Sequence, residues 1–524
     1  MLQEPARPSV DDPVVAGAAE LVGGPPGRYA RSGERRLLTA TRVLLLLTLL
    51  TCSLGWAVKA GCRNGSSWQH EYQYTRACYT DVVALYSAEG LSQGQLPYYD
   101  HPVEYPVVIG GVMQVSSVLA RGLSEALPAD APTRQARQRL ALAKTDTERS
   151  QAQTAVSYAE ANARGRHFFD VTWLLMVAAA LVVTVTTARL AGRRPWDAAM
   201  VALAPGLLLH VATNWDLVAT ALAGAGLLAW ARRRPVLTGV LLGLATATKL
   251  YPALFVVPLL PLCWRARQLR AWVITTATLA GTALVVTLPV YLTAPAYADS
   301  GGGQAQVAGS PLSRLGSGGL AALAPHAGRG TNAVWRFFEL NSTRGADWDS
   351  LYLQVQHLRP GTLSHVHTLN QVVAVLVLLG LGAVAGLALR ARRRPRLPQV
   401  LFLSMVAFLL ANKVDSPQYL LWLIPLAVLA RPRWRPFLAW QAAEVLVLVS
   451  RFYFFIHNDK PGQGIAIGWF FAAVLLRDAL LLTVAALVVR DVLRPEHDAV
   501  RRDGSDDPAG GLLDGAPERR LQPT

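Results

Sequence analysis

Charged residues are scarce in this chain of 524 residues: they make up 16% of it, whereas hydrophobic residues make up 52%. About a quarter of a soluble globular domain is charged, so the composition argues against a water-soluble protein. The charge that is present is basic, with a formal net charge of +16. The arginines flank apolar runs and do not form a basic domain with interleaved aromatic residues. This placement is typical of membrane-protein loops, and we expect no nucleic-acid partner.

Cysteine is also rare, with four residues in the whole chain. The sequence has no CxxC pair and no paired His/Cys spacing, so it predicts no zinc or other metal site. Cys52 and Cys263 lie in or beside apolar runs and are expected to act as small hydrophobic side chains. Cys62 and Cys78 share the first polar loop, where they could form a disulfide in an oxidising compartment. Sequence alone leaves the bridged and unbridged forms open, because it cannot establish the required geometry.

The sequence gives no convincing indication of a cleavable signal peptide, and no internal repeat is recognised in it. Residues 1–36 are polar, rich in Pro and Gly, and end in arginines. They are expected to be a disordered cytoplasmic tail before a first membrane anchor. Residues 491–524 are charged and contain Gly and Pro, which predicts a second disordered cytoplasmic tail. Between the tails, residues 37–490 are expected to form one membrane-embedded domain.

Long apolar runs recur through that domain, and each could cross a hydrocarbon core about 30 Å thick. They predict an all-α polytopic membrane protein with about 12–13 transmembrane helices. The predicted spans are Leu37–Val58, Phe169–Leu190, Ala198–Val211, Leu217–Trp230, Val236–Thr248, Pro252–Trp264, Trp272–Leu292, Val372–Leu389, Val400–Leu410, Tyr419–Leu429, Phe437–Phe455 and Ile465–Val489.

Five arginine clusters separate pairs of these spans, at residues 189–194, 232–234, 265–270, 390–394 and 431–435. If all five face the cytoplasm, the remaining linkers lie on the other side of the membrane. With the N-terminus in the cytoplasm, the number of crossings keeps the clusters on that side only if the apolar segment Tyr105–Leu119 does not fully cross. A thirteenth crossing is the alternative. The external side would carry the loops 59–103 and 295–369 and the short polar linkers at Asn214–Asp216, Lys249–Tyr251, Asn412–Gln418 and His457–Lys460.

Polar candidates for chemistry gather in these external linkers. Asp81 lies just after the first span, where a partly desolvated carboxylate could be a general base toward a sugar hydroxyl; a helix N-cap formed with Thr80 is the alternative. His101, Glu104 and Tyr105 lie in a proline-punctuated turn and are expected to bind substrate. Glu104 opens an apolar segment, so its charge needs a partner, although a carboxylate at a helix start is also favoured by the helix dipole.

Further along, Asp216, Lys249 and Tyr251 are expected to bind substrate. A lysine can neutralise a phosphate as a compact point charge, or it can extend to the membrane surface without any ligand. Four charged residues lie in or beside the last spans, and for these we expect structural ion pairs within the bundle more than a lipid-phosphate site. They are Glu444, Arg451, Arg477 and Asp478.

Five short motifs, taken together and in order, resemble the family 87 glycosyltransferases over about residues 37–490. The motifs are Cys78-Tyr79-Thr80-Asp81, Pro97-Tyr98 with Glu104-Tyr105-Pro106, Asn214-Trp215-Asp216, Lys249-Leu250-Tyr251-Pro252 and Ser416-Pro417-Gln418-Tyr419.

The resemblance implies an actinobacterial enzyme of the C-type glycosyltransferase (GT-C) fold in the plasma membrane, with its active site on the extracytoplasmic face. It implies transfer of a hexose, typically mannose, from a polyprenyl-phosphate donor to a glycolipid or glycan acceptor. Asp81 would be the general base, and Asp216 and Lys249 would approach the donor phosphate. No cofactor is implied, and a role for a divalent cation is open. A polytopic transporter or lipid flippase is the competing class, although such proteins often show internal repeats.

Overall fold

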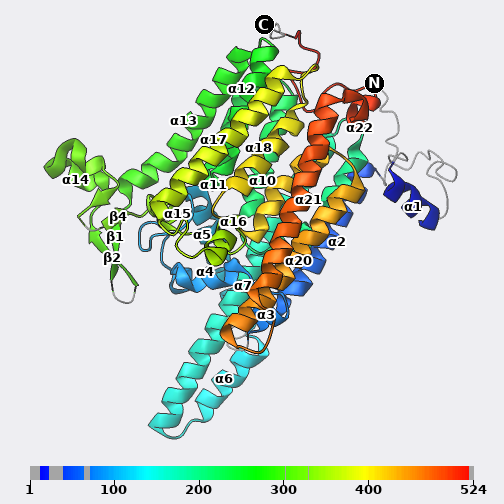
Figure 1. The fold of residues 1–524 in the computed structure, drawn as a ribbon. Coiled ribbons are helices and arrows are strands. Elements are labelled where there is room, and N and C mark those ends of the chain that lie inside the picture. Colours follow the sequence, from blue (N-terminus) through cyan, green and yellow to red (C-terminus); the bar gives the residue numbers. More distant parts are fainter. Residues whose placement is uncertain (1–11, 23–38, 64–70, 301–302, 329, 519–524) are drawn as a thin grey trace.

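The computed structural model describes residues 12–22, 39–63, 71–300, 303–328 and 330–518, and it is a tilted bundle of helices (Figure 1). Seven helices of the described chain are long and apolar enough to cross a membrane, and five shorter apolar helices accompany them. The protein is therefore a helical multi-pass membrane protein, as the apolar runs predict. Its bundle consists of α2 (Ala40–Lys59), α7 (Asp146–Leu190), α10 (Asp216–Ala231), α11 (Pro235–Thr248), α12 (Val256–Arg265), α13 (Leu269–Thr293), α17 (Val366–Arg390), α18 (Leu397–Ala411), α19 (Leu420–Ala430), α20 (Trp434–Asp459) and α21 (Ile467–Leu493).

Eleven of the twelve predicted spans fall on these helices, and Ala198–Val211 does not form one continuous helix. It is divided into a 3-10 turn (Pro195–Ala198), α8 (Ala199–Ala202) and α9 (Pro205–His210). Pro205 explains the break, because proline lacks the N–H of a helix interior and is tolerated only in a first turn. The centre of the bundle is α19, in which every side chain except Pro425 is buried. By contrast, α13 buries only Ala271, Thr275 and Leu279, as expected of a helix that faces lipid.

The C-terminal segment brings the five arginine clusters to one end of the bundle, which we call the arginine end. Residues 495–518 fold back over this end as a 3-10 turn (Pro495–His497), α22 (Ala499–Arg502) and a series of turns. Residues 491–518 contact four of the clusters: Arg194 pairs with Asp503, Arg265 with Glu518, Arg393 with Asp506, and Arg431 with Asp491. Beside the second cluster, Trp230 Nε1 donates to Gly510 O.

The prediction of a disordered tail is therefore wrong for residues 491–518. Their composition is polar, but Asp498 pairs at 2.7 Å with Arg396, which is almost fully buried. A buried arginine left without its counter-charge is strongly unfavourable. Of the N-terminal tail, α1 (Pro13–Val22) is helical, and Asp12 Oδ2 accepts a hydrogen bond from Trp434 N at 3.1 Å. The rest of the predicted tail at residues 1–36 lies outside the described residues.

Helix α5 (Val107–Ala126), which covers most of the doubtful segment Tyr105–Leu119, is long enough to cross a membrane. Its two ends nevertheless lie away from the arginine end. It begins beside Tyr105, which contacts Trp215 at the start of α10, and it ends where Ser124 bonds His167 Nδ1 at 2.8 Å. His167 is about 35 Å along α7 from the arginine end. Both ends of α5 therefore lie toward the same side of the bundle, which is the arrangement expected if the segment does not cross and the arginine clusters all face the cytoplasm.

The end opposite the arginines, which we call the loop end, carries the remaining elements. A helical hairpin of α6 (Ala131–Leu142) and the first half of α7 projects from it (Figure 1). The loop after α13 is not wholly helical: it holds a small antiparallel sheet in the order β2-β1-β4-β3, followed by α15 (Arg336–Thr343) and α16 (Leu351–Leu358). The strands are β1 (Ala296–Ser300), β2 (Gly303–Ala308), β3 (His326–Ala327) and β4 (Gly330–Asn332).

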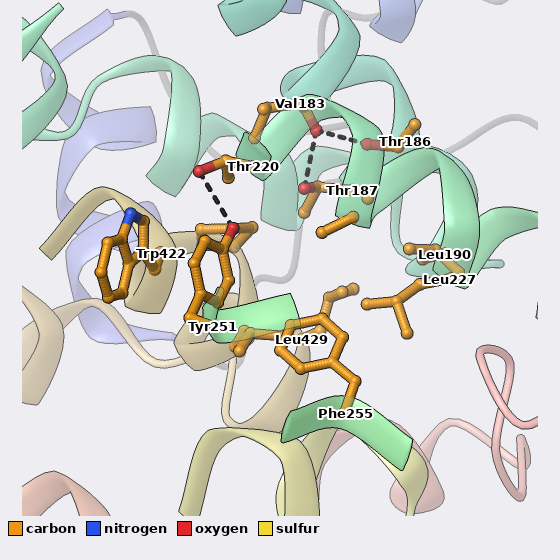
Figure 2. Close-up of a pocket in the computed structure, with 14 residues that line it drawn as sticks. Val183, Thr186, Thr187, Leu190, Thr220, Leu227, Tyr251, Phe255, Trp422 and Leu429 are labelled. Atoms are coloured by element: carbon orange, nitrogen blue, oxygen red, sulfur yellow. Dashed lines mark hydrogen bonds between the residues drawn. The ribbon is translucent and has the colours of Figure 1, made fainter. Parts of the chain in front are cut away.

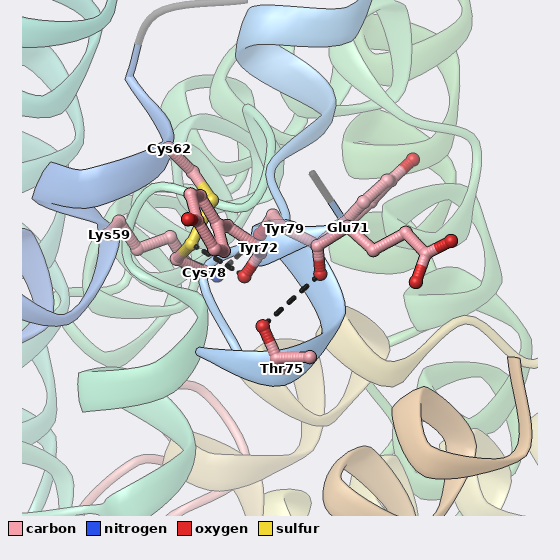
Figure 3. Close-up of a disulfide and its surroundings, with 7 residues drawn as sticks. All are labelled: Lys59, Cys62, Glu71, Tyr72, Thr75, Cys78 and Tyr79. Atoms are coloured by element: carbon pink, nitrogen blue, oxygen red, sulfur yellow. Dashed lines mark hydrogen bonds between the residues drawn. A yellow bond between two sulfur atoms is a disulfide. The ribbon is translucent and has the colours of Figure 1, made fainter. Parts of the chain in front are cut away.

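A disulfide joins Cys62, just after α2, to Cys78, just before α4 (Asp81–Ala88), with the Cα atoms 5.6 Å apart (Figure 3). The short helix α3 (Tyr72–Thr75) lies inside the loop that this bridge closes. The bridge resolves the alternative that the sequence leaves open, and it ties the segment leading to Asp81 to the loop end of α2. A disulfide is typical of a compartment with oxidising chemistry.

Candidate active site

Asp81 is the first residue of α4, and the backbone around it is held by the turn that precedes α10. Thr80, and not Asp81, is the N-cap: its Oγ1 accepts from Val82 N at 3.2 Å and donates to Ala212 O at 2.6 Å. The backbone N of Asp81 donates to Thr213 O at 2.8 Å. Because Thr80 caps the helix, the carboxylate of Asp81 is not used for capping and is available to a ligand.

The surroundings of Asp81 favour a carboxylate that is more basic than usual. Burial raises the pKa of the Asp81 carboxyl above its ordinary value, against the opposing effect of a hydrogen bond from Tyr79 and of the positive charges of Lys249 and Arg451. A partly buried carboxylate with a raised pKa takes a proton more readily than one in water. This is the environment that a general base requires.

Asp216 and Lys249 form a buried ion pair close to this carboxylate. Lys249 Nζ lies 2.9 Å from Asp216 Oδ1, and the Asp216 side chain has no exposed surface. Trp422 Nε1 donates to the same oxygen at 3.2 Å, while Asp216 Oδ2 is buried without a partner among the described residues. The two residues predicted to approach a donor phosphate separately are thus bonded to each other, so Asp216 orients the lysine.

Aromatic rings surround the ammonium group of Lys249. Its Nζ lies 5.1 Å from the ring centroid of Tyr105, 5.5 Å from that of Tyr419 and 5.9 Å from that of Trp422. Contacts of this kind stabilise a cation electrostatically when it is shielded from water. The rings therefore hold a positive charge at a fixed place at the loop ends of α10 and α11, near Asp81.

Tyr251, predicted to bind substrate, packs against Trp422, one of the rings around Lys249. Its ring stacks on that of Trp422 with centroids 4.3 Å apart, and its hydroxyl donates to Thr220 Oγ1 at 3.3 Å. The side chain is buried, and it borders a small apolar cavity that Leu190 and Leu429 also line (Figure 2). Its position therefore indicates a packing role.

The turn at residues 97–106 brings Glu104 and Tyr105 to the site but directs His101 elsewhere. Tyr98, in the left-handed region at φ 70°, places its hydroxyl 2.9 Å from the carbonyl oxygens of both Tyr105 and Pro106. His101 Nδ1 lies 3.4 Å from Glu89 Oε2, and Glu89 Oε1 accepts a hydrogen bond from Glu104 N at 3.3 Å, so Glu89 braces the turn.

Glu104 is close enough to Asp81 and Lys249 for their charges to affect it. Burial, with the nearby negative charge of Glu89, raises the pKa of Glu104 to about 7. Of the seven predicted site residues, the structure therefore brings together Asp81, Glu104, Tyr105, Asp216 and Lys249. His101 contacts Glu89 and Tyr251 stacks on Trp422, so neither belongs to this group.

Arg451 also reaches this site, although the sequence favoured structural pairing for it over a lipid-phosphate site. Its Nη1 lies 3.2 Å from Asp349 Oδ2, and its charge also acts on Asp81 and Tyr79. The neighbouring Phe452 contacts Tyr79, with ring centroids 6.3 Å apart, so α20 packs directly against the segment that carries Asp81. The only signal in the sequence was a lone arginine within an apolar run, a placement that often marks function.

The other charged residues of α20 and α21 form the structural network that was predicted. Arg477 lies 2.9 Å from Asp415, 2.6 Å from Asp478 and 3.8 Å from Glu444, and it donates to Asp349 O at 3.0 Å. Among the described residues, no group of three or more His, Cys, Asp or Glu side chains is arranged to hold a metal ion.

Comparison with known families agrees with the resemblance found in the motifs. Residues 165–302 match the model of glycosyltransferase family 87. The matched stretch contains Asp216, Lys249 and Tyr251, whereas Asp81, Glu104 and Arg451 lie outside it. A search of curated proteins found no match.

Proposed function

We propose, because residues 165–302 match glycosyltransferase family 87 in a multi-pass helical membrane protein, that this glycosyltransferase moves a hexose from a polyprenyl-phosphate donor. Mannose is the sugar that the family resemblance suggests, and a glycolipid or cell-envelope glycan is the acceptor. The observation that carries the proposal is the placement of Asp81, uncommitted to capping and beside two fixed cations, Lys249 and Arg451.

Two features support an extracytoplasmic site in the plasma membrane. The arginine clusters gather at the end of the bundle opposite Asp81, and cytoplasmic loops are the ones enriched in arginine. The Cys62–Cys78 bridge lies at the same end as Asp81, where an oxidising compartment favours it.

The geometry suits an inverting displacement. Asp81 takes the proton of an acceptor hydroxyl while that oxygen attacks the anomeric carbon of the donor, which acquires oxocarbenium character as in other glycosyl chemistry. The bond from the anomeric carbon to the phosphate oxygen breaks as the new glycosidic bond forms. The polyprenyl phosphate leaves with the bonding electrons, and Lys249 or Arg451 meets its negative charge.

The test is transfer by purified protein in lipid nanodiscs from a panel of radiolabelled polyprenyl-phosphate sugars. Asp81→Asn is expected to lower transfer by about 10²–10⁴-fold, the usual contribution of general-base catalysis, with unchanged thermal unfolding. Asp100→Asn is the matched control, because Asp100 is an exposed acid in the same loop. Full transfer by Asp81→Asn would refute the assigned role. Movement of intact donor across the bilayer without sugar transfer would favour the transporter or flippase.

A further inference from the structure

A small lobe between β2 and β3 exposes more leucine than a water-facing loop should. It consists of α14 (Pro311–Gly318) and the 3-10 helix Gly319–Leu323, and we call it the α14 lobe. Leu320 is 85% exposed, and Leu312, Leu315 and Leu323 are also exposed. Leu312 and Leu315 are three residues apart and share one face of α14, as Leu320 and Leu323 share one face of the tighter helix. Clustered exposed apolar side chains of this kind mark an interaction surface.

The lobe is fastened to α13, a helix that buries little of its surface within the bundle. Tyr291 Oη, near the end of α13, donates to Leu323 O at 2.8 Å, and Asn332 Nδ2 donates to Tyr291 O and Ala294 O at 3.1 and 2.9 Å. In the turns just before Tyr291, α13 exposes Leu284, Val285 and Leu288. The apolar surface of α13 therefore continues to the point where the lobe is attached.

The direction in which the lobe projects also distinguishes it from the other external elements. In Figure 1 it extends sideways from the loop end of α13, beyond the outline of the bundle, whereas the α6–α7 hairpin projects along the bundle. A segment directed sideways at this level lies over the lipid that surrounds α13, and a segment directed along the bundle lies in water.

We propose that the leucine face of the α14 lobe is embedded in the membrane leaflet at the loop end. Short helices with one apolar face bind in the plane of a membrane interface in this way, and burying the exposed leucines there removes their apolar surface from water. Two hydrogen-bond contacts connect the end of α13 and strand β1 to the turn that carries Glu104: Tyr99 Oη lies 2.9 Å from Thr293 Oγ1, and Tyr297 Oη donates to Tyr99 O at 2.5 Å. The inference requires only that α13 spans the membrane, so it stands apart from the sugar-transfer proposal.

The test places an environment-sensitive probe on the lobe. Leu320→Cys and, separately, Leu312→Cys carry an NBD fluorophore on the full chain in nanodiscs, with or without lipids that bear a nitroxide near the headgroup. Leu142→Cys is the matched control: it is 77% exposed, but it ends α6 at the tip of the projecting hairpin (Figure 1). Unsubstituted protein corrects for labelling of Cys52 and Cys263, which are both buried.

The expected result is a blue-shifted emission at both lobe positions that nitroxide lipids quench several-fold more than the emission at position 142. Equal, weak quenching at all three positions would overturn the proposal. A blue shift without lipid quenching, accompanied by a dimeric mass, would also overturn it, because the leucines would then be covered by a second copy of the chain.

Discussion

Lys249 has two proposed roles, one in stability and one in chemistry, and a double-mutant cycle on its ion pair separates them. In Lys249→Met, the Asp216 carboxylate stays buried and keeps one hydrogen bond, from Trp422 Nε1 at 3.2 Å. Leaving one partner of a buried pair uncompensated costs about 3–5 kcal/mol. Adding Asp216→Asn removes the second charge, and a neutral replacement of a whole buried pair is often close to neutral in stability. The double variant should therefore recover most of the lost stability.

Sugar transfer should not recover with it. A fixed donor that meets developing negative charge is worth about 10²–10³-fold in rate, so both Lys249→Met and the double variant should lose transfer by about that factor. The assays are thermal unfolding in nanodiscs and transfer from labelled lipid donor at a temperature at which every variant is folded. Lys460→Met is the matched control, because Lys460 and Glu71 form an exposed pair at 2.9 Å whose loss should cost less than about 1 kcal/mol.

Two outcomes would refute this reasoning. If the double variant transfers sugar at close to the wild-type rate, Lys249 does not meet the leaving phosphate. If Lys249→Met is as stable as the wild type, the Asp216–Lys249 pair is open to water, contrary to its burial in the structure.

Two further predictions concern pH and the C-terminal segment. The pKa of Glu104 is raised to about 7 from an ordinary 4.5, so the stability contributed by its bound proton is fully present below about pH 4.5 and is lost as the pH rises through 7, a loss of at most about 3 kcal/mol. Melting temperatures measured from pH 5 to 8 should therefore fall more steeply in the wild type than in Glu104→Gln. Equal slopes would contradict the assignment. Asp498→Ala should lower the free energy of unfolding by about 3–5 kcal/mol, because it strands the buried Arg396, whose Nε lies 2.7 Å from Asp498 Oδ2. Glu160→Ala, which breaks a solvent-exposed pair with Arg137, should cost less than about 1 kcal/mol in the same unfolding measurement. An equal loss in both variants would show that the pair at Asp498 is not shielded.

Local features were enough to predict the membrane class and the sorting of polar groups. The length of an apolar run and the position of arginines are properties of short segments, and they predicted eleven of the twelve spans and the common end of the five arginine clusters. They left open whether Tyr105–Leu119 crosses, because that segment is apolar enough to do so. The break at Pro205 was missed because hydropathy does not register the hydrogen bond that proline removes.

Local sequence features did not predict the roles of the site residues. Five of the seven predicted residues meet, but their roles depend on partners that are distant in the chain. Asp216 and Trp422 are separated by 206 positions, and Arg451 reaches the segment of Asp81 only because α20 packs against it. Whether an aspartate caps a helix, pairs with a lysine or stays available is decided by such packing, which composition does not encode.

By itself, the sequence determined that this chain is a bundle of membrane helices with its arginines at one end and its polar loops at the other. These properties follow from the free energy of transferring each segment between water and lipid, which is a sum over neighbouring residues. Only the tertiary structure decided that Thr80 releases Asp81 from capping, that Asp216 holds Lys249 among aromatic rings, and that residues 491–518 cover the arginine end. Those outcomes depend on which helices lie side by side, and long-range packing alone settles that.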